Sequence, residues 1–321
     1  MKPEISLIIP YYNESLIALK TLNLVYEQSV SPEEVIFVDS NSNDNTSLII
    51  KNFINKNNLK NWKIINTNYK TPSEAKNHGI SKCKYEWCAF MDFDIYFPSN
   101  WIENQCKFIS QYENILISYG TVNLNPKNYF DRLVISQTYG IKSSSPVIPS
   151  SFIHKKYFEY HGFFLPYRSL YDKFFIKKSF KEKNNKNILK NKNISVDYFD
   201  INYAKNFNEL FIKTLNYSIQ TIYIKGNYIP YIYPFIFIIS IFITIQEPKL
   251  IPFIFLIIFL TRGILIPIKK NKSFFKFFRL RDIPFIFIVG IFIDISKFIG
   301  ICIGWLLKFL NKKVRLDHLY K

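Results

Sequence analysis

Two aspartates separated by one residue carry the clearest chemical signal in the chain. Asp92 and Asp94 follow an apolar run, Trp87 to Met91, that has the composition of a buried strand. Residues i and i+2 of a strand face the same side, so both carboxylates should point together while Phe93 packs on the other face. Two like charges that close need a cation, and Mg²⁺ or Mn²⁺ is typically held by one or two carboxylates plus substrate phosphates. The spacing therefore predicts a divalent-metal site at a strand end.

A third carboxylate, Asp39, ends another apolar run and begins a polar segment that continues to Thr46. An ionised carboxylate only accepts hydrogen bonds, so at a sheet edge it can take the N–H of a base such as uracil. Asp44 in the same segment has two interpretations, a functional group or, like Asn45, a cap of the following helix.

The first 95 residues predict that these acidic groups share one edge of a sheet. Short β-rich runs alternate with segments whose apolar residues recur at helical spacing. This repetition gives a parallel sheet with right-handed crossovers, and ligands bind outside the carboxyl ends of its strands. Strands are expected at Ile5–Ile9, Glu34–Asp39, Lys63–Asn66 and Trp87–Asp92, and helices at Ser15–Gln28, Asn45–Asn55 and Ser73–Cys83.

The next part of the chain, to about residue 223, has a mixed pattern. Strands are expected near Tyr119–Leu124 and Ser150–His154, and a helix over Asn208–Tyr223. The lysine- and asparagine-rich segment Lys177–Lys192 is typical of a solvated loop, with a lipid-headgroup contact as the alternative.

The apolar residues, 48% of the 321, concentrate after Tyr228. The runs 229–245 and 250–268 approach the ~20 residues of a spanning helix, and a short polar link between them predicts a helical hairpin. The basic segment Lys269–Arg281 follows, and by the positive-inside rule it and the preceding domain face the cytoplasm. We therefore expect an integral protein of the inner or plasma membrane.

The third apolar run, 283–310, contains Asp294 and Lys297 one turn apart. Burying both charges in a bilayer is unfavourable, so a re-entrant or interfacial segment is the expectation. The net charge of +18 also suits the anionic surface of a membrane. Nucleic acid is not an expected partner, because no zinc-finger spacing, aromatic RNA-binding signature or basic zipper accompanies the charge.

Four segments together resemble glycosyltransferase family 2, whose members have the GT-A fold. In chain order they are Ile5-Ser6-Leu7-Ile8-Ile9-Pro10-Tyr11-Tyr12-Asn13-Glu14, Val35-Ile36-Phe37-Val38-Asp39-Ser40-Asn41-Ser42-Asn43-Asp44-Asn45-Thr46, Ala75-Lys76-Asn77-His78-Gly79-Ile80 and Phe90-Met91-Asp92-Phe93-Asp94. The resemblance covers about residues 3 to 180. It implies an α/β fold with a mostly parallel sheet, a GT-A domain over 1–223 and a membrane region over 224–321. Within the domain, residues 1–95 would bind the nucleotide-sugar and residues 96–223 the acceptor.

The resemblance also implies roles for individual residues. The implied nucleotide-sugar contacts are Pro10, Tyr12, Glu14, Asp39, Lys76 and Asp92, and the implied metal ligands are Asp94 and Asp92. Many relatives have arginine where this chain has Lys76, and lysine keeps the charge but loses the bidentate geometry. His78 also replaces a second basic residue.

On the acceptor side, the segment ending in Gly162-Phe163-Phe164 resembles the family's Gly-Gly-Phe segment. Asp172 follows at the place of the family's acidic pair, with Tyr171 in place of the second acid. The resemblance thus implies that Asp172 is the catalytic base. His154 and His161 are expected to be structural.

These features predict inverting transfer of a sugar from a nucleoside-diphosphate donor, with UDP as the expected nucleotide, to a hydroxyl of a lipid-linked or cell-surface glycan. One alternative is a polyprenyl-phosphate sugar synthase, whose ionised acceptor needs little general base. Another is a catalytically silent, nucleotide-binding membrane scaffold. Release of nucleoside diphosphate from a sugar donor distinguishes the scaffold from both enzymes.

Overall fold

The computed structural model describes residues 3–68, 71–143, 148–166, 171, 175, 187–201, 203–223, 229–271 and 274–310. Contacts within the chain divide it into two units. Unit 1 comprises residues 1–123 and 143–199, and unit 2 comprises residues 124–142 and 200–321. The predicted boundary at residue 223 between a catalytic domain and a membrane region stays a prediction. Unit 2 begins earlier in the chain than that boundary because two amphipathic helices, α5 (Tyr129–Gln137) and α8 (Phe207–Thr221), pack with α13 (Ile283–Phe309).

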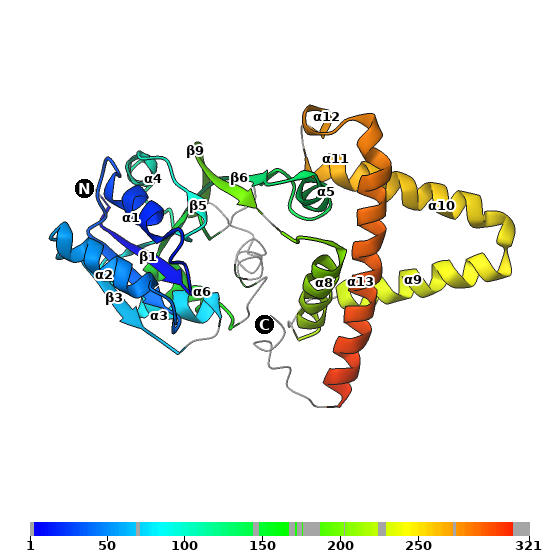
Figure 1. Ribbon diagram of the computed structural model, residues 1–321, viewed down its shortest axis with the longest axis horizontal. Helices are drawn as coiled ribbons and strands as arrows, with labels where there is room; N and C mark the ends of the chain where they lie inside the picture. The colour runs from blue at the N-terminus through cyan, green and yellow to red at the C-terminus, as the bar shows by residue number, and fades with distance from the viewer. Residues whose placement is uncertain are drawn as a thin grey trace. The chain divides into compact units, whose positions relative to one another are not determined.

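Unit 1 contains a sheet whose first half is parallel (Figure 1). Its strands lie in the order β3 (Trp62–Asn66), β2 (Glu34–Asp39), β1 (Ile5–Tyr11) and β4 (Trp87–Phe90). Nearly all side chains of β1, β2 and β4 are buried, as expected for apolar runs covered on both faces. The register pairs Tyr11 with Asp39, so the two strands end at the same level.

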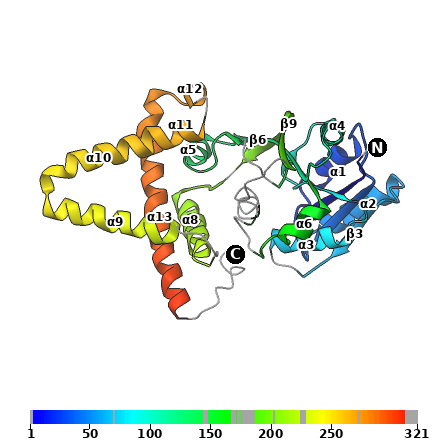
Figure 2. The same cartoon turned by 180° about the vertical axis from the view of Figure 1, so that it is seen from behind.

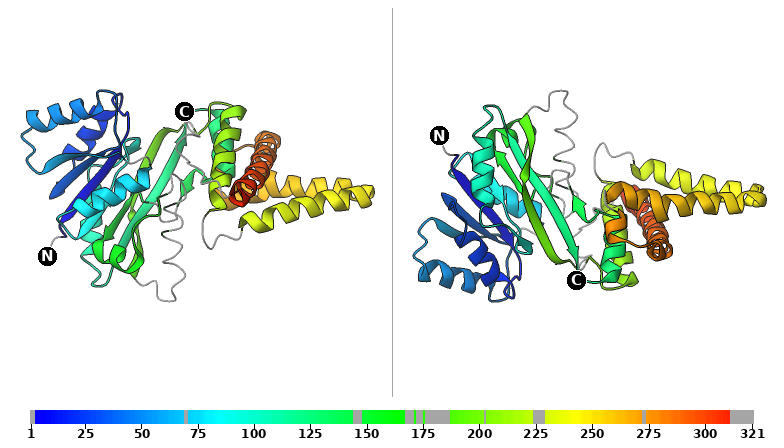
Figure 3. Two further views of the ribbon diagram at one scale, coloured as in Figure 1. Left: turned by 90° about the horizontal axis from the view of Figure 1, so that it is seen from below. Right: turned by 90° about the horizontal axis from the view of Figure 1, so that it is seen from above.

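Helices cover both faces of these strands. On one face, Phe53 of α2 (Thr46–Lys56) stacks on Trp62, which also contacts Phe37. The other face is covered by α3 (Pro72–Lys82) and α6 (Lys155–His161), which bury one cluster with Ile8 (Figure 3). A Cβ at Gly79 of α3 would lie 2.5 Å from Ile8 Cγ2. Only glycine lets α3 approach β1 this closely.

The other half of the sheet is antiparallel. β8 (Ser151–His154) pairs with β4 and with β6 (Ile117–Pro126), and β9 (Ile188–Ile201) pairs with β5 (Ile95–Tyr96). The helix α4 (Trp101–Ile109) follows β5, and α1 (Ala18–Tyr26) follows β1. The predicted sheet strands and helices are thus found within a few residues of their expected ends.

Two expectations for unit 1 are wrong in detail. The strand before the acidic pair ends at Phe90, so Asp92 and Asp94 lie in the turn between β4 and β5. The segment Lys177–Lys192 is not a loop throughout, because residues 188–192 begin β9. Asn191 there is 1% exposed and donates to the Asn104 carbonyl, a tertiary contact that composition does not reveal. Residues 177–186 lie outside the described part.

Unit 2 is helical (Figure 2). Its helices are α5 (Tyr129–Gln137), α8 (Phe207–Thr221), α9 (Ile229–Gln246), α10 (Ile251–Phe259), α11 (Ile266–Lys270), α12 (Phe274–Phe277) and α13 (Ile283–Phe309), with the short strand β7 (Lys142–Ser143) at its border and one-turn segments η2 (Pro248–Leu250), η3 (Leu260–Leu265) and η4 (Leu280–Asp282). On α13, a Cβ at Gly300 would lie 2.5 Å from the Leu215 carbonyl oxygen of α8. Glycine therefore permits the close packing of these two helices.

Two helical stretches among the described residues, Pro248–Lys270 and Leu280–Phe309, are long and apolar enough to cross a membrane by length and composition. The predicted pair 229–245 and 250–268 corresponds to α9 and to the stretch α10–η3–α11, which Figure 1 shows as a hairpin. The predicted segment 283–310 is one continuous helix, and Asp294 on it pairs with Arg262 of η3. A re-entrant or interfacial placement of this helix stays a prediction.

Candidate active site

The loops after β1 and β2 are held together by hydrogen bonds. The Asn13 N–H donates to Ser42 Oγ over 3.1 Å, and the Asn43 N–H donates to Asn13 Oδ1 over 2.9 Å. The Glu14 N–H donates to Thr46 Oγ1 over 2.8 Å. Asn13 adopts a φ of 57°, a conformation that asparagine tolerates better than most residues. The polar residues of the two motifs therefore build a single cross-linked loop pair at the carboxyl ends of the strands.

Asp44 anchors this loop pair. Its carboxylate accepts hydrogen bonds from the Ser15 N–H and from both the N–H and the hydroxyl of Thr46, over 2.6–3.0 Å. Burial alone would raise the pKa of Asp44, but these hydrogen bonds lower it to about 2. The geometry therefore favours the capping interpretation of Asp44, since Thr46 is the first residue of α2.

Asp39 lies at the wall of a polar cavity. Its side chain is 6% exposed, and its two oxygens accept from the Ser42 N–H over 2.8 Å and from the Ser47 hydroxyl over 2.6 Å. The Tyr11 hydroxyl oxygen lies 2.9 Å from Ser47 Oγ. The pKa of Tyr11 is raised by burial and by the nearby Asp39 charge. The cavity of about 500 Å³ is lined by Asp39, Asn41, Ser42, Ser47, Asn66, Thr67 and Asn68.

The turn after β4 contains a buried ion pair. Lys76 is 1% exposed, and its ammonium donates to Asp92 Oδ1 over 2.8 Å and to the Tyr171 hydroxyl over 3.1 Å. Burial alone would lower the pKa of Lys76, but the charge of Asp92 outweighs this and raises it. The lysine that replaces the family's arginine is thus bound to the first aspartate of the acidic pair, which positions that carboxylate.

The remaining acidic groups repel one another. Asp94 is exposed on one side, yet the surrounding protein and the charge of Asp92 raise its pKa to about 6. The pKa of half-buried Glu14 is raised to about 7, first by burial and then by Asp94, Asp44 and Asp92. The negative charges of Asp92 and Asp94 therefore disfavour ionisation of Glu14, and a cation bound at this edge would reduce the repulsion among the three carboxylates.

The donor set fits a hard divalent ion. It offers the carboxylate oxygens of Asp92 and Asp94, the ligand type that Mg²⁺ and Mn²⁺ prefer. Within the described residues, no three acidic, histidine or cysteine side chains are arranged to hold an ion. Mg²⁺ is typically held by one or two carboxylates together with substrate phosphates, so these two side chains are sufficient as protein ligands.

Phe93, between the two acids, is 6% exposed and contacts the Tyr11 ring, with centroids 5.6 Å apart. The prediction that it packs away from the carboxylates is confirmed. Pro10 is half-buried in β1, and Tyr12 is 56% exposed in the loop that follows. Neither of them lines the cavity beside Asp39, so their roles at a nucleoside stay predictions.

Asp172 lies outside the described residues. Its neighbour Tyr171 is described, and the Tyr171 hydroxyl reaches Lys76. The segment before it is fixed by Asn77, whose side chain forms paired hydrogen bonds with the Phe164 backbone, over 2.8 and 3.0 Å. The acceptor-side segment is therefore tied to α3, which also carries Lys76.

Sequence reasoning assigned no role to Ser47, Asn77 or Tyr171. Asn77 stands inside the third motif and Ser47 directly follows the second, so their positions could have suggested them. Tyr171 stands in the sequence only at the place of the family's second acid. Its contact with Lys76 joins residues 95 positions apart, which no local pattern predicts.

The two histidines have structural surroundings. His154 caps α6 by accepting from the Lys156 N–H, and its ring contacts Trp87 edge-on. His161 packs against Tyr157, with ring centroids 4.3 Å apart.

The sheet, with acidic loops at the carboxyl ends of its parallel strands, has the architecture of the GT-A fold. The sequence profile described as glycosyl transferase family 2 matches residues 6–181. That match covers more than half of the chain, so the chain belongs to this family.

Curated relatives share part of this domain. The chain is 30% identical over 93 residues, 29% of its length, to a GalNAc(5)-diNAcBac-PP-undecaprenol beta-1,3-glucosyltransferase of Campylobacter jejuni. It is 30% identical over 122 residues, 37% of its length, to the poly(ribitol-phosphate) beta-N-acetylglucosaminyltransferase TarS of Staphylococcus aureus. The matches span 30% and 21% of these relatives' own lengths.

One solved structure is similar over most of the chain. It is the mannosyltransferase PcManGT of Pyrobaculum calidifontis in complex with GDP-Man and Mn²⁺, with a TM-score of 0.54 and 12% identity. The similarity covers 98% of this chain and 89% of that one, and at this identity it demonstrates the fold alone.

Proposed function

We propose that this protein is a membrane-attached, inverting glycosyltransferase. It transfers a sugar from a UDP-linked donor to a hydroxyl of a lipid-linked or cell-surface glycan. One observation carries the proposal: in a chain of glycosyl transferase family 2, three carboxylates gather at one edge of the sheet. Asp92 is paired with buried Lys76, and its charge also acts on Asp94 and Glu14.

The donor's nucleoside binds at the cavity beside Asp39. Each Asp39 oxygen accepts one hydrogen bond within the protein, which leaves lone pairs for the imide N–H of uracil. The amide and hydroxyl groups of Asn66, Thr67 and Ser47 supply the further polar contacts that orient a base. Pro10, Tyr12 and Glu14 do not line this cavity, and their proposed contacts with the nucleotide are made from the adjoining β1 end and loop.

The diphosphate binds where Asp92 and Asp94 face solvent. These two carboxylates would hold Mg²⁺ or Mn²⁺, which would neutralise charge on the leaving diphosphate. Lys76 holds the Asp92 carboxylate in place, because its buried ammonium donates to Asp92 Oδ1 over 2.8 Å. Lys76 therefore acts on the diphosphate through Asp92.

The acceptor side is formed by the segment that Asn77 fixes at Phe164, followed by Asp172. Asp172 takes the proton of the acceptor hydroxyl as that oxygen attacks the sugar from the face opposite the leaving group. A direct displacement of this kind inverts the anomeric centre. The C. jejuni and S. aureus relatives are named for undecaprenol-linked and poly(ribitol-phosphate) acceptors, which supports an acceptor at the cell envelope.

Membrane attachment is supported by the two apolar helical stretches and by exposed apolar side chains on α9 and α10, among them Phe242, Ile245, Phe253 and Ile257. Such a patch is unfavourable in water. The catalytic domain faces the cytoplasm, where nucleotide-sugars are made, and the basic segment Lys269–Arg281 faces the anionic lipid surface on the same side.

A thermal-shift experiment on the purified protein tests donor and metal together. Ligand at 100 times its Kd stabilises by about 2.7 kcal/mol, which is roughly 5–10 °C for a domain of this size. We expect UDP with Mn²⁺ to give such a shift, UDP alone a smaller one, and GDP little.

Two variants assign the contacts. Asp39→Asn should weaken the UDP shift while keeping its dependence on Mn²⁺, and Asp94→Asn should remove the dependence on Mn²⁺. A protein that gives no shift with any nucleoside diphosphate, and releases none from a sugar donor, would instead be a silent scaffold.

A further inference from the structure

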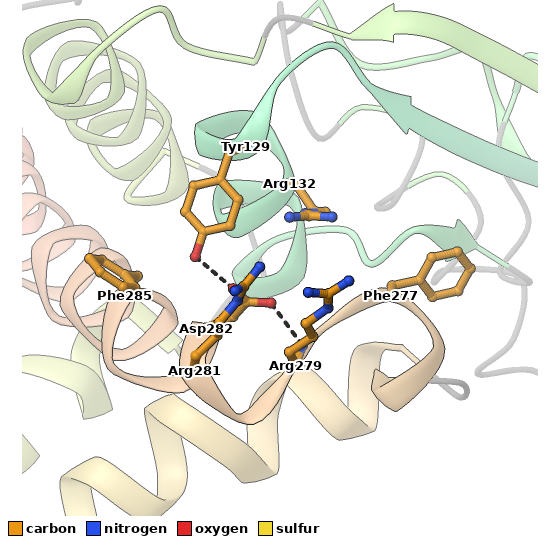
Figure 4. Close-up of a pocket in the computed structure, with 7 residues that line it drawn as sticks. All are labelled: Tyr129, Arg132, Phe277, Arg279, Arg281, Asp282 and Phe285. Atoms are coloured by element: carbon orange, nitrogen blue, oxygen red, sulfur yellow. Dashed lines mark hydrogen bonds between the residues drawn. The ribbon is translucent and has the colours of Figure 1, made fainter.

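Unit 2 contains a cavity of about 470 Å³ whose lining residues all belong to that unit (Figure 4). It lies between α5 and the segment that leads into α13. The lining residues are Tyr129, Arg132, Phe277, Arg279, Arg281, Asp282 and Phe285. Three guanidinium groups and one carboxylate thus meet at one cavity.

The one acidic residue that lines the cavity, Asp282, already accepts hydrogen bonds within the protein. Asp282 is 5% exposed, and its oxygens accept from the Tyr129 hydroxyl over 2.9 Å and from the Arg279 N–H over 2.8 Å. One carboxylate can cancel at most one of the three guanidinium charges, so the cavity retains an excess of about two positive charges.

The Arg132 guanidinium is positioned by two aromatic rings and keeps an unpaired donor. Its guanidinium lies over the rings of Tyr129 and Phe278, at 5.0 and 5.9 Å from their centroids. Its Nε is buried and has no hydrogen-bond partner in the protein. A buried donor without a partner is unfavourable, and a ligand oxygen in the cavity would satisfy it. Arg279 and Arg281 are exposed at the rim, so their guanidinium groups are accessible to the same ligand.

The surroundings of the cavity are apolar. Phe275, Phe277, Leu280 and Phe285 are all exposed large hydrophobic residues within eleven positions of one another. Phe275 and Phe277 lie between the two stretches long enough to cross a membrane, Pro248–Lys270 and Leu280–Phe309, and Leu280 and Phe285 lie in the first turns of the second stretch. In a membrane-attached protein the segment that carries these four residues therefore lies at the depth of the lipid headgroups, with its aromatic and leucine side chains toward the acyl chains.

We propose that the cavity lined by Arg132, Arg279 and Arg281 binds the phosphate group of an anionic lipid. Arginine pairs with phosphate oxygens through several N–H groups at once, which suits this ligand better than a simple point charge. The lipid's acyl chains lie along the exposed aromatic residues. The site anchors unit 2 at the anionic leaflet. It rests on the membrane attachment proposed above and is independent of the transfer reaction.

Binding of short-chain lipids to the full-length protein in detergent micelles tests this site. Dioctanoyl phosphatidylglycerol is titrated and its affinity measured by calorimetry, with dioctanoyl phosphatidylcholine and inorganic phosphate as comparison ligands. We expect phosphatidylglycerol to bind more tightly than either. Equal affinity for phosphatidylcholine would overturn the role of charge, and equal affinity for inorganic phosphate would overturn the lipid as the ligand.

Variants locate the binding at the cavity. Arg281→Gln changes an exposed side chain, so it should fold normally and bind phosphatidylglycerol about 10-fold more weakly, as expected for a lost charged hydrogen bond. Arg132→Gln should lose at least as much affinity, with its thermal unfolding recorded to verify the fold. Lys276→Gln removes an exposed charge from the same segment outside the cavity and is the matched control. Wild-type affinity in Arg281→Gln, or an equal loss in Lys276→Gln, would refute the site.

Discussion

The buried pair of Lys76 and Asp92 allows a quantitative test of how the acidic turn is held. Lys76→Met keeps an unbranched side chain of similar length in a site that is 1% exposed, and it removes the charge together with the hydrogen bonds to Asp92 and Tyr171. Asp92 then loses its partner beside Asp94. Breaking a fully buried pair costs about 3–5 kcal/mol, and because Asp92 is 26% exposed we expect about 2–4 kcal/mol.

Asp92→Asn breaks the same pair from the other side. The Lys76 ammonium would then remain buried with the Tyr171 hydroxyl and a neutral amide as acceptors, so we expect a similar loss. For a domain of this size, either loss lowers Tm by about 5–15 °C. The double variant Lys76→Met, Asp92→Asn leaves no buried unpaired charge. It should be more stable than the sum of the single losses predicts, by at least ~1 kcal/mol.

Thermal unfolding of the full-length protein in detergent, without divalent ions, measures these differences. Asp94→Asn is the matched control, because it makes the same chemical change two residues away at an exposed side chain. It should leave Tm nearly unchanged or raise it slightly, since it removes a repelling charge. Additive losses in the double variant, within ~0.5 kcal/mol, would refute the structural role assigned to the pair.

Four further predictions concern the reaction, the membrane and pH. Asp94→Asn should abolish transfer with the fold intact, and more than a tenth of wild-type turnover at saturating Mn²⁺ would exclude it as an essential ligand. Asp172→Asn should reduce turnover ~10² to 10⁴-fold with donor affinity unchanged, and near-normal turnover would favour a phosphate acceptor. A protein ending near Tyr223 should lose carbonate-resistant membrane attachment, which fractionation measures. The pKa of Glu14 in the folded protein is about 7, above its unfolded value of 4.5, so ionisation of Glu14 destabilises the fold. This loss of stability develops as pH rises from the unfolded pKa to the folded one, and it is complete above pH 7. Glu14→Gln should therefore raise Tm near pH 8 but little near pH 5, and equal effects at both pH values would contradict the raised pKa.

The parallel half of the sheet was predictable because its signals are local. β1 and β2 are buried on both faces, so their residues form continuous apolar runs, and polar motifs begin where each strand ends. The sequence alone therefore predicts that Asp39 and the acidic pair lie at the same edge of the sheet, at the carboxyl ends of its parallel strands. The predicted strand before the pair extends two residues beyond the observed one, because the buried Met91 continues the apolar run past the end of β4.

Other features depend on distant parts of the chain. Asp44 could be read either as a functional group or as a cap, and its bonds to Ser15 and Thr46 favour the cap. The basic segment before α13 suggested only an orientation in the membrane. That Arg279 and Arg281 meet Arg132, some 150 positions earlier, follows from packing of α5 in unit 2.

Sequence alone determined the family, the α/β order of the first half, the acidic residues at its edge and the apolar character of the last third. Each of these features follows from periodicity, composition or short motifs, and such patterns depend only on residues that are close together in the chain. Tertiary structure decided that Lys76 is buried against Asp92 and Tyr171, that α5 and α8 pack with the C-terminal helices, and that three arginines surround one cavity. These pairings join residues far apart in the chain, and the free energy that selects them comes from burying surfaces that only the folded chain brings together.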